Sequence, residues 1–408
     1  MQLTEPERRI RHDTVRPGSA SPAARSRMRK RFHVRQLAQA NMNALSRRLI
    51  RLSLAAACVL ACGSSSAQAP VPWPYEFLRK YAHCSPAEFH DIEQGRVVVK
   101  ILPTRVKQEV VSFGVVRIDV PQEFFVARFR DIEKFKKGRF VPEVKKFSEP
   151  PSPEDLKGLS LELGEIESLK RCRVHDCPVK LSAEAMQSFQ RQIDWKAPDY
   201  REQAAELLQQ ILLRRVQAYL AGGSATLGHY DDKKYSLDLA AEFRGLLDKS
   251  PYLAEYVPEF DHYLREYPGV RLEGAEHFVY WSKEKYTQDA KAVIAITSTS
   301  IYRQEDTLGK PFLITSQQVY ASHYFEGSLG VALLVDVSEG QTTPRIYLVN
   351  LNRSRIDFLR GFFAFLIRGT IARRLQSEMK NVMGSLKERM EASYLEESSH
   401  VEPNAALP

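Results

Sequence analysis

The sequence of 408 residues lacks the short motifs that identify the common reaction classes. It contains no G-x-S-x-G, no H-E-x-x-H, no phosphate-binding P-loop and no dinucleotide-binding glycine fingerprint. The pair Glu276-His277 does not continue to a second histidine. No reaction class is therefore supported, so we predict no cofactor and no metal, and we favour a non-enzymatic role over an enzyme.

Long apolar runs and repeats are also missing from most of the chain. Beyond residue 69 no stretch approaches the 18 or so uninterrupted apolar residues of a membrane-spanning helix. We find no repeat at a fixed period, which removes solenoid and propeller architectures. The remaining length is ample for a large core, in one elaborated domain or two.

Cysteine is scarce, with five in the whole chain. Cys172 and Cys177, in C-R-V-H-D-C, are predicted to form a disulfide if the protein reaches an oxidising compartment. The alternative is a metal site that uses both thiolates and His175. Zinc takes four ligands, and no second Cys/His cluster supplies the others. Cys84 is then left over as a buried, free thiol.

The positive charge is concentrated in residues 1–69, which hold 13 Lys/Arg and 3 Asp/Glu, whereas the whole chain has 59 and 50. The remainder therefore has 46 basic and 47 acidic residues, and this balance gives no reason to expect a nucleic-acid partner. Residues 1–41 are Arg-rich and precede Met42, a possible start. We favour a wrongly assigned start codon; the alternative is a basic arm for anionic lipid or nucleic acid.

A signal peptide explains the residues that follow. Basic residues at 46–51 precede an apolar run at 52–62. Its length is typical of a secretory signal, which takes about 7–15 apolar residues, and too short to span a bilayer. Cleavage after Ala67 and lipidation at Cys62, in a lipobox-like V-L-A-C, remain alternatives. We predict export to the periplasm or cell envelope, with membrane contact only through the signal peptide or a lipid anchor at Cys62.

The patterns of the mature chain place an all-helical stretch between two strand-rich parts. Leu159, Leu161 and Leu163 alternate and indicate a strand over 159–169. Ser85 and Ser182 are predicted helix caps. Other strands are predicted at 97–102, 109–120, 277–283, 292–302, 312–325, 329–337 and 345–351, and helices at 121–134, 200–220, 237–247, 252–267 and 354–395.

This organisation divides the chain into six segments. They are a basic extension with signal peptide (1–67), a Pro-rich tether with short helices (68–96), the first part of an α+β domain (97–181), a helical insert (182–268), an antiparallel meander with a C-terminal helix (269–395) and a disordered tail (396–408).

The order of these elements resembles the START-like helix-grip fold of lipid-transfer and polyketide-cyclase-like proteins. The resemblance rests on residues 110–132 and 292–386, and on Y-L-V-N-L-N-R-S-R at 347–355, where the last strand is expected to pass into the long helix. It covers about half of the mature chain, and the helical insert departs from it. It implies an α+β fold in which a curved antiparallel sheet grips the C-terminal helix around an apolar cavity for a lipid.

The predicted ligand-binding residues come from the last strands and the C-terminal helix. His323 is expected to share a strand face with its neighbours and to point inward, and Arg353 to begin the helix and contact an anionic headgroup. The alternative for His323 and for Arg353 is a purely structural role. Asn352, next to Arg353, is expected to cap the helix under that alternative. The full set is Val319, Ala321, His323, Phe325, Arg353, Leu359 and Phe363.

Three functions are consistent with these observations. The favoured one is an exported binding protein for a lipid or other apolar small molecule, held between the sheet and the C-terminal helix. The second is a structural protein with a solid core, which docks an envelope partner through its helical insert and exposes an apolar patch there. The third is a cyclase- or hydrolase-like enzyme with His323 as general base, which requires a carboxylate or tyrosine within hydrogen-bonding reach.

Overall fold

The computed structural model describes residues 74–285, 291–305, 307, 310–361 and 364–401. The chain divides into two units, residues 1–70 and 71–408, and the described residues all belong to the second. The predicted signal peptide, the basic extension, Cys62 and Phe363 lie outside the described residues, as does the end of the tail.

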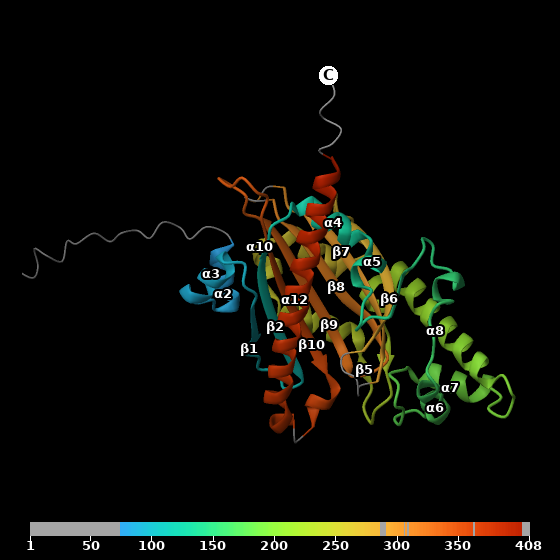
Figure 1. The fold of residues 1–408 in the computed structure, drawn as a ribbon. Helices are drawn as coiled ribbons and strands as arrows, with labels where there is room; N and C mark the ends of the chain where they lie inside the picture. The colour runs from blue at the N-terminus through green and yellow to red at the C-terminus, as the bar shows by residue number, and fades with distance from the viewer. Residues whose placement is uncertain (1–73, 286–290, 306, 308–309, 362–363, 402–408) are drawn as a thin grey trace, which may run out of the picture. The chain divides into compact units, whose positions relative to one another are not determined.

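An eight-stranded sheet, antiparallel throughout, forms the centre of the second unit (Figure 1). Its order is β1-β2-β10-β9-β8-β7-β6-β3, so β1 and β3 are edge strands and β10 returns beside β2. The strands are β1 (Val98–Leu102), β2 (Glu109–Ile118), β3 (Glu143–Lys146), β6 (Glu276–Glu284), β7 (Val293–Arg303), β8 (Phe312–Ala321), β9 (Phe325–Asp336) and β10 (Ile346–Ile356). This architecture confirms the predicted α+β class with a large antiparallel sheet and a long C-terminal helix.

One face of the sheet is covered by most of the helices. Apolar side chains such as Val115, Val349 and Leu333 point from the strands into a core that the helices complete with Leu212, Phe243 and others. The helices that contribute to this core are α2 (Tyr75–Ala82), α3 (Pro86–Glu93), α6 (Leu163–Arg171), α7 (Ala183–Gln192), α8 (Tyr200–Gly222), α9 (Leu239–Asp248), α10 (Pro251–Tyr256) and α11 (Pro258–Glu266). A small hairpin of β4 (His229–Tyr230) and β5 (Leu237–Asp238) lies among the predicted insert residues.

The opposite face is covered by α4 (Gln122–Arg130), α5 (Ile132–Lys136) and α12 (Ala364–Val401). Alternate residues of the same strands, among them Val116 and Leu348, pack there against Met383 and Met390 of α12. Contact is close at Gly114, where an added Cβ would lie 2.3 Å from the Met383 sulfur. The sheet and this part of α12 therefore enclose no cavity at Gly114.

The predicted helix starts are confirmed where a cap residue is present. Ser85 accepts a hydrogen bond from the Glu88 N–H and forms a capping box, with Pro86 in the first turn. Ser182 accepts one from the Ala185 N–H. No helix among the described residues is both long enough and apolar enough to cross a bilayer.

The strand predicted over residues 159–169 is wrong, because this segment forms the helix α6. Glu162 and Glu165 form a capping box, in which the Glu162 N–H donates to Glu165 Oε2 at 2.6 Å. Ile166 and Leu169, three residues apart, are then buried while Leu163 is exposed. Leu159 and Leu161 therefore lie in a loop, and Leu163 is the first residue of the helix that follows.

The predicted boundary between the last strand and the C-terminal helix is also wrong. Strand β10 continues to Ile356 because it pairs with β2 and β9 along its whole length. A short 3₁₀ helix, η3 (Asp357–Arg360), follows, and α12 begins only at Ala364. At its other end α12 continues to Val401, so residues 396–401 are helical rather than a disordered tail.

The turn expected at Glu326-Gly327 lies a few residues earlier. Both residues belong to β9, and the chain reverses at residues 322–324, where Tyr324 has a positive φ of 62°. The Ser322 hydroxyl accepts from the Ile294 N–H at 2.9 Å and fixes this turn to β7. His323 is therefore in a turn and not on a strand face.

Candidate functional site

A groove of about 400 Å³ lies between the free edge of β1, the end of α2 and α12. Its size falls within the range of small-molecule sites, about 300–1,000 Å³. The lining residues are Ala82, His83, Lys100, Ile101, Leu102, Pro103, Ala372, Arg373 and Gln376. Five of these nine are aliphatic or proline, so the groove is mostly apolar with a few polar groups at its sides.

The local sequence explains why the groove is open. His83 ends α2 with a left-handed φ of 51°, which stops the helix beside β1. Gln376 of α12 donates its Nε2–H to the Val99 carbonyl at 2.7 Å, so the Val99 backbone points outward from the sheet. Because the backbone of a strand repeats every second residue, Ile101 also directs its backbone toward the groove.

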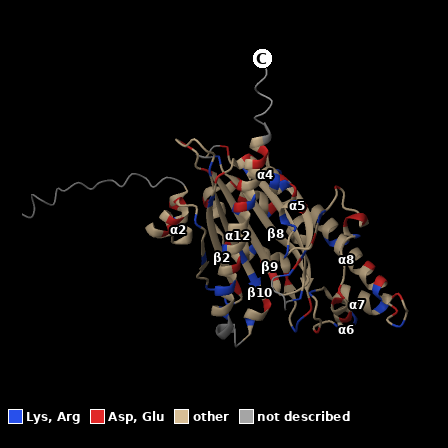
Figure 2. Ribbon diagram, viewed as in Figure 1, with Lys and Arg blue, Asp and Glu red and all other residues tan. Residues whose placement is uncertain are grey.

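Two cationic side chains flank the groove, and only one of them is neutralised. Lys100 donates to the carbonyls of Ala82 and His83, at 3.2 and 2.8 Å, and pairs with Glu88 at 2.8 Å. It thus stabilises the carbonyl end of α2. Arg373 is exposed, and no described carboxylate pairs with it. Acidic residues appear on α12 only from Glu378 onward, where the helix carries charges of both signs (Figure 2).

The structure separates the predicted ligand-binding residues. Val319 faces the helical layer beside Tyr230 and Phe243, next to a space of about 10 Å³, which is room for one water at most. Phe325 and Leu359 lie in an apolar cluster that contacts α12. Ala321 is buried at the end of β8. These side chains do not converge on a common cavity.

His323 is buried, as predicted, but its partner is not a side chain. It forms a hydrogen bond with the backbone carbonyl of Pro178. Burial, and next the positive charge of Lys291, lowers the pKa of His323 to about 4. A general base needs an orienting carboxylate or tyrosine, and among the described residues none is hydrogen-bonded to it.

Arg353 lies on β10 and not at the start of the C-terminal helix. It forms an ion pair with Glu109, whose side chain is fully buried at 0% exposure. Arg355 lies 3.7 Å from the same carboxylate and also pairs with Glu242. Arg353 is therefore held inside the protein by a carboxylate, and it is not presented to a ligand.

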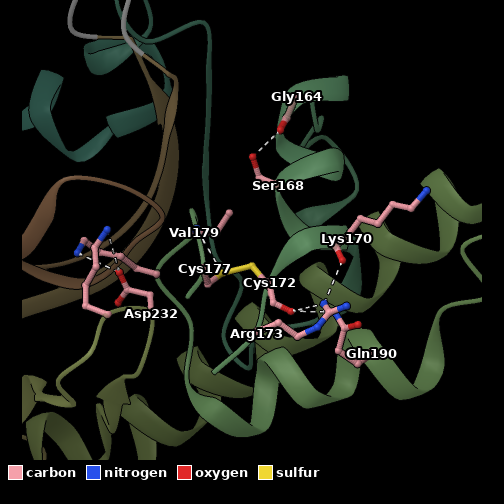
Figure 3. The surroundings of a disulfide bond; sticks show 11 residues. Gly164, Ser168, Lys170, Cys172, Arg173, Cys177, Val179, Gln190 and Asp232 are labelled. Carbon is pink, nitrogen blue, oxygen red and sulfur yellow. Dashed lines mark hydrogen bonds and ion pairs between the residues drawn. A yellow bond between two sulfur atoms is a disulfide. The ribbon is translucent and has the colours of Figure 1, made fainter. Parts of the chain in front are cut away.

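The predicted disulfide between Cys172 and Cys177 is present (Figure 3). His175, between them, contacts the Lys233 carbonyl through Nδ1 at 3.0 Å and takes no part in a metal site. Nowhere in the described part of the chain do three His, Cys, Asp or Glu side chains gather to hold a metal ion. Cys84 is buried and free, as predicted, and burial raises the pKa of its thiol to about 11.

Sequence reasoning missed a partly buried polar chain centred on His277. Tyr267 Oη lies 3.1 Å from His277 Nδ1, and Ser298 Oγ lies 2.8 Å from its Nε2. Tyr219 donates to Ser298 at 2.8 Å. The groups resemble a nucleophile and a base, but Ser298 is buried and none of them lines the groove. The pairing of β6 with β7 brings these groups together. Val279 lies opposite Ser298, and His277 is two residues before Val279 on the same strand.

Acid is expected to destabilise the protein through His323, which is buried, and His277, which is partly buried. Burial lowers the pKa of His277 and of His323 to about 4, so both stay neutral in the folded protein while the unfolded chain takes up protons below about pH 6.5. Stability is thus complete above pH 6.5 and is lost as the pH falls toward 4. Between pH 7 and 5 each histidine should remove about 2 kcal/mol from the free energy of unfolding.

Urea unfolding at pH 7 and pH 5 measures this loss, and the matched comparison is His277→Gln. The variant should lose about 2 kcal/mol less than the wild type between the two pH values, because one titrating group is gone. An identical pH dependence in both proteins would contradict the assignment.

The comparisons with known proteins identify no relative. No protein-family model matches the chain, and no curated protein or solved structure matches it either. The START-like resemblance thus stays a prediction.

Proposed function

We propose that the mature chain is an exported, non-enzymatic binding protein of the cell envelope that holds an amphipathic, anionic ligand of the fatty-acid class. The ligand lies in the groove between the edge strand β1 and α12. Export through the signal peptide, with or without a lipid anchor at Cys62, is part of the proposal. So is a START-like ancestry, in which the ligand site has moved from the sheet face to the sheet edge.

One observation carries this proposal: an apolar groove of ligand size has an unneutralised cation beside it. Ile101, Leu102 and Ala372 supply apolar surface for a hydrocarbon chain. Arg373 supplies a guanidinium that can bind a carboxylate in bidentate fashion. Lys100 adds positive potential but is already paired, so Arg373 is the expected headgroup contact.

The alternative of a partner-docking insert finds less support in the surface. Among the described residues, the large apolar side chains that are most exposed are Phe140, Leu163, Tyr235, Phe358, Val382 and Leu395. Only Tyr235 of these lies within residues 182–268, and its hydroxyl donates to Glu326 at 2.9 Å. A docking surface on the insert would require a contiguous apolar patch.

Calorimetric titration with oleate tests the proposal. Arg373→Gln should weaken binding about tenfold, because a charge-assisted hydrogen bond is lost. Ala372→Trp should abolish binding, because the indole would occupy part of the groove and block the path of a hydrocarbon chain. The matched control is Arg374→Gln, which removes an equally exposed guanidinium of the same helix turn that does not line the groove. Equal affinity in Ala372→Trp and the wild type would contradict the proposal.

A further inference from the structure

Three segments that are far apart in the sequence bring a lysine and two aspartates together inside the protein. Lys180 Nζ lies 2.9 Å from Asp357 Oδ2 and 3.8 Å from Asp232 Oδ2. The side chains of Lys180 and Asp232 are only 3% and 5% exposed, and that of Asp357 is 15% exposed. The ammonium therefore sits between two carboxylates that are largely shielded from water.

The backbone of each of the three residues is fixed by a hydrogen bond. The Lys180 N–H donates to the Ser322 carbonyl at 2.9 Å, and the Asp357 N–H donates to the Tyr324 carbonyl at 2.9 Å. The Asp232 carbonyl accepts from the N–H of Cys177, a member of the nearby disulfide, at 3.1 Å (Figure 3). The three side chains thus approach one another from anchored positions, which is the arrangement that favours an intramolecular reaction.

Aromatic rings and two further cations surround the three groups. The Tyr230 ring lies 5.5 Å from Lys180 Nζ, and the Arg215 guanidinium lies over the rings of Tyr230 and Tyr320. Lys233, 4.0 Å from Asp232, is about half exposed. Burial raises the pKa of Asp232. One buried ammonium thus faces two carboxylates.

We propose that Lys180 and Asp357 form an intramolecular isopeptide bond, and that Asp232 transfers protons in the reaction. Within the described residues, this cluster places two carboxylates beside one buried amine, and the backbone of each of the three residues is anchored. The neighbouring buried pair of Lys283 and Glu165, at 3.3 Å, differs because Lys283 also donates to the Ser160 carbonyl.

The condensation balances without any further reactant. A proton passes from the Lys180 ammonium to Asp357, which leaves a neutral amine and a carboxylic acid. The amine lone pair attacks Cγ of Asp357, the C–N bond forms and the carbonyl becomes tetrahedral. Asp232 accepts a proton from the nitrogen and returns one to the departing oxygen, so the C–O bond breaks and one water leaves. The products are a neutral amide and water.

The burial of the site favours the condensation, because the reaction replaces two buried charges with one neutral amide. The amide would join the segment after the disulfide to the first residue of η3, which directly follows β10. It would therefore link the helical layer covalently to the end of the sheet.

Intact mass spectrometry of the reduced, denatured mature protein tests the proposal. The expected mass is one water below the mass of the reduced sequence, and a protease digest should contain a branched peptide that joins the segments holding Lys180 and Asp357. A protein of full sequence mass would overturn the proposal. A mass loss without the branched peptide would do the same, because it indicates a succinimide.

Variants identify the groups without depending on activity. Lys180→Arg keeps the cation but lacks a nucleophilic amine, and Asp232→Asn lacks the proton-transfer group, so both should have the full mass. Lys283→Arg, in the other buried pair, is the matched control and should remain one water lighter. Branched peptide in Lys180→Arg would overturn the assignment. The wild-type measurement decides the question even where a variant does not fold.

Discussion

Replacing Gly223 with alanine is expected to lower the free energy of unfolding by at least about 3 kcal/mol. Gly223 begins the 3₁₀ helix η2 (Gly223–Thr226) with φ 62° and ψ −151°, a conformation that is essentially restricted to glycine. An added Cβ would lie 1.7 Å from the Tyr267 carbonyl oxygen and 2.8 Å from its carbon. Because these are backbone atoms, they cannot move aside without displacing the chain between α11 and β6.

Gly228 provides the matched control for this substitution. It also has a positive φ, of 70°, but an added Cβ there would meet no atom within 4 Å. Gly228→Ala should therefore cost only the backbone strain, about 1 kcal/mol. Urea unfolding of both variants at pH 7 measures the difference. Equal losses would show that the close contact between Gly223 and Tyr267 is absent in solution.

Replacing Glu109 with alanine is expected to cost about 3–5 kcal/mol, because it leaves the largely buried guanidinium of Arg353 without its carboxylate. Glu109 is fully buried, pairs with Arg353 and accepts a hydrogen bond from the Thr104 hydroxyl at 2.8 Å. Arg355 lies 3.7 Å from its other oxygen. The penalty arises from the uncompensated charge of Arg353 and not from the net strength of the ion pair.

Two further variants separate these contributions. Glu276→Ala breaks an exposed pair with Arg130 and should cost less than about 1 kcal/mol. The double variant Glu109→Leu with Arg353→Met removes both charges and should recover much of the stability that Glu109→Ala loses. Thermal and urea unfolding measure all four proteins. A double variant as unstable as Glu109→Ala would contradict the explanation.

Local signals in the sequence predict the elements that depend on local chemistry. Ser85 and Ser182 mark helix starts because their hydroxyls accept from the N–H groups of the first turn. The short spacing of Cys172 and Cys177, together with the predicted export to an oxidising compartment, predicts their disulfide. The alternating strands between residues 276 and 356 predict an antiparallel meander because short turns join them.

The errors arise where contacts distant in sequence decide the structure. Arg353 belongs to a strand because β10 pairs with both β2 and β9, and its carboxylate partner is Glu109, which no local pattern identifies. Val319 and Phe325 lie on one predicted strand, but a turn at residues 322–324 sends them to different clusters. The partly buried chain of His277 and Ser298 likewise depends on strand register.

The sequence also did not predict the groove, because the groove too depends on contacts between residues that are distant in sequence. It unites residues 82–83, 100–103, 372–373 and 376, and it exists because β1 is an edge strand. The sequence shows β1 as an ordinary short strand, and nothing in it identifies which strands lie at the edges. The predicted pairing of sheet and C-terminal helix is confirmed, whereas the location of the groove follows only from the order of the strands.

Native mass spectrometry of the mature protein with oleate and with oleyl alcohol tests the central claim most directly. The two probes share a hydrocarbon chain and differ in the carboxylate that Arg373 is proposed to bind. We predict a one-to-one complex with oleate, a weaker complex with the alcohol, and neither complex in Ala372→Trp. Failure of the wild type to bind oleate, or equal binding by Ala372→Trp, would contradict the assignment of the groove as a ligand site.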